Sequence, residues 1–110
     1  MTATDLPRTS GLEHDLEQVY RDREQLLRAV PSAARSQLIA DQFDHEAWLW
    51  SVLFERTRSP LTWRAALAAE AYARGSARWW RRNAAELAAQ DRAAGRVTDP
   101  RPAAPTTEEV

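Results

Sequence analysis

Residues 59–94 read SPLTWRAALAAEAYARGSARWWRRNAAELAAQDRAA, and this stretch decides the fold class. Ser59 can accept a hydrogen bond from an orphan N–H at a helix start, and Pro60 suits the first helical position, where its missing N–H costs nothing. No alternation typical of a strand follows. The stretch predicts one long helix over 60–94. Glycine costs about 1 kcal/mol relative to alanine inside a helix, so a break at Gly75 is the alternative.

A second helix is predicted near the N-terminus. Ser10 followed by Glu13 is a capping box, in which the hydroxyl and the carboxylate each accept from an orphan N–H. We therefore expect a helix over about 11–30. Residues 1–9 are small, polar or proline and are expected to form a disordered tail.

A third helix is predicted between these two. Ser32 can cap it, and its apolar periodicity runs over about 33–57. The expected fold class is therefore all-α, a compact three-helix arrangement in a helical domain of residues 10–95. Residues 96–110 hold three prolines and an acidic end, and are expected to form a disordered tail.

Composition and charge exclude several function classes. Fifteen basic and sixteen acidic residues leave a formal charge of −1, so the chain lacks the overall basic excess typical of nucleic-acid-binding domains. It has no cysteine, which excludes thiolate metal sites and cysteine nucleophiles. It also has no phosphate-cradling glycine loop and no Glu-x-x-His pair of the kind found in helical metal centres. We expect no enzymatic activity, metal or cofactor.

Hydropathy and targeting signals favour the cytoplasm. No uncharged apolar run approaches the roughly 18 residues of a membrane span. The N-terminal stretch MTATDLPRTS lacks the apolar core of a signal peptide. A membrane role is therefore not expected.

The first two helices each carry a charge on an apolar face. Arg23 falls on the apolar stripe of the first helix, and Glu46 on that of the second. Because a carboxylate on a core face needs a partner, we expect the two to form a buried pair; the alternative is an arginine that extends to the rim. The apolar stripes are Leu12, Leu16, Val19, Leu26 and Val30 in the first helix, and Leu38, Ile39, Phe43, Ala47, Leu49, Trp50, Leu53 and Phe54 in the second.

The third helix has two predicted faces. The inward face is expected to hold Leu61, Ala65, Ala69, Tyr72, Trp79, Trp80 and Leu87. The outward face, which we call the arginine stripe, holds Arg64, Arg74, Arg78, Arg81, Arg82 and Arg92. The second helix has an outward acidic stripe of Asp41, Asp44 and Glu55, with Trp48 among them. If the inner faces pack, these two outward stripes point away from each other and are free to meet another molecule.

These stripes give the functional hypotheses. The first is a non-enzymatic protein–protein interaction or regulatory module that self-associates, with the acidic stripe of one copy receiving the arginine stripe of another. The alternative is a small DNA- or RNA-binding regulator that uses the third helix, because arginine contacts phosphate and tryptophan stacks on bases. The bland interpretation is a solvated helix face. The predicted contact residues are Trp48, Trp63, Arg74, Arg78, Arg81 and Arg82.

Overall fold

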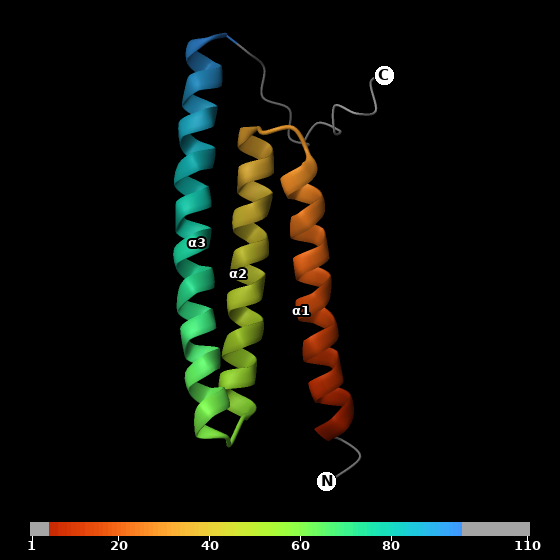
Figure 1. Cartoon of the computed structure of the whole chain (residues 1–110). Coiled ribbons are helices and arrows are strands. Elements are labelled where there is room, and N and C mark those ends of the chain that lie inside the picture. The colour runs from red at the N-terminus through yellow and green to blue at the C-terminus, as the bar shows by residue number, and fades with distance from the viewer. Residues whose placement is uncertain (1–4, 96–110) are drawn as a thin grey trace.

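The computed structural model describes the backbone of residues 5–95 and the side chains from residue 11 onward. Its three helices are α1 (Asp5–Arg28), α2 (Ala33–Arg56) and α3 (Pro60–Ala93). Consecutive helices run antiparallel (Figure 1). No strand occurs within residues 5–95, so the predicted all-α, three-helix class is confirmed.

The start of α1 differs from the prediction. The helix begins at Asp5, not near residue 11, so part of the predicted N-terminal tail is helical. Pro7 is tolerated there because the first four N–H groups of a helix have no intrahelical acceptor. The rest of the predicted tails, residues 1–4 and 96–110, lies outside the described residues.

Serine caps fix the starts of the other two helices, as predicted. Ser32 Oγ accepts from the backbone N–H of Arg35 at 3.0 Å, and Ser59 Oγ accepts from that of Thr62 at 3.3 Å. α3 runs unbroken through Gly75, which excludes the two-helix alternative. It is therefore a single rod of about 50 Å, from the rise per residue of an α-helix.

The middle helix holds the fold together. α2 packs against both α1 and α3, whereas α1 and α3 make no backbone approach to each other within the described residues. Figure 1 shows the three helices side by side, with α1 leaning away from α2 toward its N-terminal end. The principal extents of 58 × 29 × 17 Å describe a thin layer. Among the residues that the structure describes, much of the surface of α3 is consequently uncovered.

The α2–α3 contact is a seam of small residues. Ala73 and Ala77 are fully buried and pack against Ile39 and Phe43 of α2. Alanine brings helix axes close together, because the distance between them depends on the side chains at the contact. The buried residues of α3 are Ala66, Ala73, Ala77 and Ala84, and α2 contributes Ala33, Ser36, Ala40 and Ala47.

The predicted inward face of α3 is largely wrong. Leu61, Ala65, Tyr72 and Trp79 are exposed. Three other members of that face, Ala69, Trp80 and Leu87, are half-buried at its edge. The helix is rotated so that its alanines form the buried seam with α2, and Trp80 packs against that seam only in part. Side-chain size decides the contact, because bulky residues on this face would hold the two helices apart.

Candidate functional site

Arg23 of α1 and Glu46 of α2 meet across the α1–α2 contact. Arg23 Nη1 lies 2.7 Å from Glu46 Oε1, and both side chains are largely buried. The indole N–H of Trp50 donates to Glu46 Oε2 at 3.0 Å, and the Tyr20 hydroxyl lies 3.5 Å from the same oxygen. The Arg23 guanidinium also lies 4.0 Å from the ring centroid of Phe43. Since the carboxylate is saturated by groups of the same chain, this cluster serves to join α1 to α2.

The surroundings of this cluster shift the pKa of the Tyr20 phenol. Burial raises the pKa of Tyr20 above its ordinary 10.0, and the neighbouring Glu46 carboxylate raises it further, against a lowering by Arg23. A second negative charge beside Glu46 is unfavourable. The phenol therefore stays a neutral donor over a wider pH range than a free tyrosine.

The acidic stripe of α2 is not separate from the arginine stripe of α3. Arg81 Nη2 bridges Asp41 Oδ1 at 3.1 Å and Asp44 Oδ2 at 2.5 Å. The expectation that these stripes point away from each other is thus wrong for these three residues. A long arginine side chain spans the gap between two closely packed helices. Of the acidic stripe, Glu55 is exposed and lies outside this bridge.

The other predicted arginines divide into two kinds. Arg74 Nε donates to Glu70 Oε2 at 2.9 Å, one turn away on the same helix. Arg78 and Arg82 form no ion pair within the described residues. Of the four arginines predicted as contact residues, two are therefore available and two are partly neutralised.

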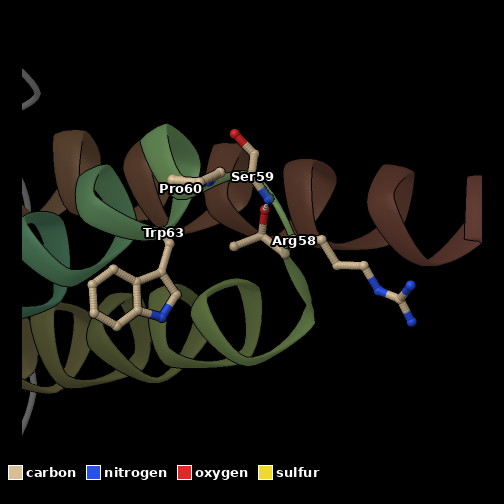
Figure 2. A pocket seen from close by; sticks show the side chains of 5 residues that line it. Arg58, Ser59, Pro60 and Trp63 are labelled. Carbon is tan, nitrogen blue, oxygen red and sulfur yellow. Dashed lines mark hydrogen bonds between the residues drawn. The ribbon is translucent and has the colours of Figure 1, made fainter.

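Trp63 lies in the first turn of α3, next to the α2–α3 connection. Its ring lies 4.6 Å from that of Phe54, tilted by 31°. Figure 2 shows the indole directed along the end of α2, beside a shallow pocket from which Arg58 points away. The pocket is lined by Thr57, Arg58, Ser59, Pro60 and Trp63. Trp63 is 42% exposed, and its contact with Phe54 is of the kind that stabilises a helical hairpin.

Trp48 lies apart from these contacts. It is 58% exposed on α2, with the ring of His45 at 6.3 Å. The acidic stripe shares this side of the helix. The structure therefore does not bring Trp48 and Trp63 together into one site.

A surface that the sequence interpretation missed runs along α3. Its residues repeat at spacings of four and three, so they share one helix face. Tyr72 is 71% exposed and Leu61 79% exposed. The Trp79 ring meets that of Trp80 edge-on at 5.0 Å, which joins the stripe to the core. We call this surface the aromatic stripe: Leu61, Ala65, Ala68, Tyr72, Gly75 and Trp79.

The spacing of apolar residues in the sequence could have revealed the aromatic stripe. α3 carries two heptad-spaced apolar stripes, one aromatic and one built on alanine at 66, 73, 77 and 84. Only one of them can face α2. A helix with two such stripes indicates a second packing partner.

No group of three or more His, Asp or Glu side chains within the described part of the chain could hold a metal ion. None of the described helices has an apolar stretch long enough to cross a bilayer.

Comparison with known proteins finds no matching family, no similar characterised protein and no similar solved structure.

Proposed function

We propose that the protein is a non-enzymatic helical module that binds protein partners through the aromatic stripe of α3. The observation that carries this proposal is the exposure of Leu61, Tyr72 and Trp79, at 79%, 71% and 53%, on one face of a helix that α2 does not cover. Single exposed apolar residues are common on protein surfaces, but an aligned row of them marks an interaction site.

The composition of the stripe supports a protein partner. Tyrosine and tryptophan dominate the binding energy of protein interfaces, because they present a large rigid area at low entropic cost. Between Tyr72 and Trp79 lies Gly75, and before Tyr72 lie Ala65 and Ala68. These small residues would let another helix approach closely. A chain without cysteine needs no oxidising compartment, and we place this role in the cytoplasm.

Site-directed photo-crosslinking in cells tests this proposal. A benzophenone amino acid replaces Tyr72 in one variant and Trp48 in a matched control, because Trp48 is also aromatic and 58% exposed but lies on α2. The expected result is a covalent protein adduct from position 72 and none from position 48. Equal adducts from both positions, or none from either, would contradict the proposal.

Nucleic acid is a second candidate ligand, favoured by one observation. Arg78 and Arg82 form no ion pair within the described residues, and Arg82 lines a shallow pocket with Trp79. The Arg82 guanidinium beside the Trp79 indole suits phosphate contact with base stacking, although Glu86 also lines this pocket. Fluorescence anisotropy with a labelled single strand over a range of salt tests it, since phosphate binding weakens steeply as salt rises. Affinity that Arg78→Gln with Arg82→Gln leaves unchanged would exclude these residues as the site.

A further inference from the structure

We infer that the partner on the aromatic stripe is a second copy of this chain, bound antiparallel about a two-fold axis near residue 70. This inference rests on the proposed function, because it uses the same surface. Within residues 5–95, α3 lies at the edge of the helical layer with α2 alone beside it, so a second α3 can reach it (Figure 1).

The sizes of the side chains are self-complementary about this axis. In an antiparallel pair centred on residue 70, Tyr72 lies opposite Ala68 of the copy and Trp79 lies opposite Leu61. Ala65 lies opposite Gly75. Near the axis a large side chain thus meets a small one, two small ones meet about one and a half turns to either side, and the large pair lies at the ends of the contact. A two-fold contact of this kind repeats each pairing twice and closes without forming a filament.

The open space at Gly75 fits this arrangement. A Cβ at this position would meet only the far end of Arg78, at 3.8 Å, within the single chain. No packing among the described residues therefore requires glycine in the middle of α3, where it costs about 1 kcal/mol. Close approach of a second helix backbone gives the glycine a role.

The surface area that two aromatic stripes can bury against each other predicts a reversible dimer. The stripe from Leu61 to Trp79 spans about 27 Å of helix. Its two aromatic residues each offer on the order of 100 Å² of exposed surface. With Leu61 and the alanines, the pair buries roughly 1,000 Å² in total, close to the lower end of specific interfaces at about 1,200 Å². We therefore expect a reversible monomer–dimer equilibrium rather than a permanent dimer.

The salt dependence of self-association distinguishes this contact from one between a basic and an acidic stripe. On one flank, Arg64 of one copy lies near Arg78 of the other, and like charges repel. Salt screens that repulsion and leaves the apolar contact intact. Self-association should therefore be unchanged or strengthened between 50 and 500 mM NaCl, whereas a contact between basic and acidic stripes would weaken.

Sedimentation equilibrium of the full chain tests the partner. Tyr72→Glu should weaken self-association at least tenfold, and Trp48→Glu should leave it within twofold. Tyr72 is exposed, so the variant should keep the helical circular dichroism of the parent. A chain that stays monomeric up to about 1 mM would overturn the inference, as would a dimer that Tyr72→Glu leaves intact.

Disulfide trapping tests the antiparallel register, on a chain with no native cysteine. Ala65→Cys with Gly75→Cys should give a covalent dimer on oxidation, because the two positions face each other across the axis. Within one chain they lie about 15 Å apart along the helix, too far for a disulfide. Ala65→Cys alone should not crosslink. Equal crosslinking by the single variant would overturn the antiparallel register.

The two experiments separate the inference from the function on which it rests. If the chain is monomeric in sedimentation but position 72 photo-crosslinks a different protein, the interaction function stands and the second-copy inference fails. If neither self-association nor an adduct at position 72 is found, both fail.

Discussion

Arg23 and Glu46 form the ion pair that joins α1 to α2, with 2.7 Å between Nη1 and Oε1 and side-chain exposures of 15% and 7%. Removing one member of a buried pair leaves the other charge without compensation, at a cost of about 3–5 kcal/mol. Arg23→Met should therefore lower the free energy of unfolding by that amount, measured by urea denaturation. This is a large fraction of the stability of a small domain.

The double variant Arg23→Met with Glu46→Leu should recover only part of this loss. Trp50 Nε1 donates to the same carboxylate at 3.0 Å, and an orphaned buried donor costs about 1–3 kcal/mol. The two single substitutions should be strongly non-additive. Additive effects in this cycle would show that the pair is not coupled in solution.

This pair also shows how much of the structure can be predicted from the sequence. Periodicity places Arg23 and Glu46 on the apolar stripes of successive helices, and a buried charge demands a partner. The contributions of Tyr20 and Trp50 depend on the rotation of each helix, which periodicity alone does not define. The same ambiguity explains the error in α3. Alanine lies on several of its faces, so hydropathy could not choose between the alanine seam and the bulkier stripe that includes Tyr72.

Arg81 marks a second limit of the helical projection. A helical-wheel projection treats each helix separately, and it places Arg81 and Asp44 on outward faces. In the structure their charged groups meet across the α2–α3 contact, because the long side chain reaches past the seam of alanines. Small residues at that seam brought the two outward stripes within reach of each other.

Tyr20 should make stability fall at high pH. Burial and the Glu46 carboxylate raise the pKa of the Tyr20 phenol in the folded chain above its ordinary 10.0. The folded state then holds the proton more tightly than the unfolded state, so this contribution is complete below pH 10 and is lost as pH rises through the folded-state pKa. Urea unfolding at pH 9 and pH 11 should show a smaller loss for Tyr20→Phe than for the parent. The same loss in both proteins would contradict the assignment.

The Arg81 bridge should contribute little to stability. Its side chain is 41% exposed, and those of Asp41 and Asp44 are 53% and 45% exposed. Exposed pairs are weakened by solvent screening and typically contribute about 0–1 kcal/mol. Arg81→Gln should therefore lower the free energy of unfolding by less than about 1 kcal/mol, and the loss should shrink in 1 M NaCl. A cost of several kcal/mol would show that the bridge is less solvated than its exposure indicates.

Gly75→Ala should stabilise the single chain. The added Cβ meets only Arg78 Nη2, at 3.8 Å, and alanine is favoured over glycine in a helix interior by about 1 kcal/mol. In the monomeric Tyr72→Glu background, Tm should rise by roughly 4–8 °C, measured by circular dichroism. A fall in Tm in this background would mean that a Cβ at position 75 clashes with its surroundings. That result would contradict the open space found around Gly75.

A matched pair of alanines tests the rotation of α3 directly. Ala73 is fully buried between α3 and α2 and packs with Ile39 and Phe43, whereas Ala65 is exposed. Leucine at position 73 must force the two helices apart, which costs about 1–3 kcal/mol or more. Leucine at position 65 enters solvent and should change stability by less than about 0.5 kcal/mol. Both substitutions are made in the Tyr72→Glu background, so that association does not contribute, and the free energies of unfolding are compared in urea. If Ala65→Leu is the costly one, the inward face expected from hydropathy is right, and the aromatic stripe lies inside the molecule.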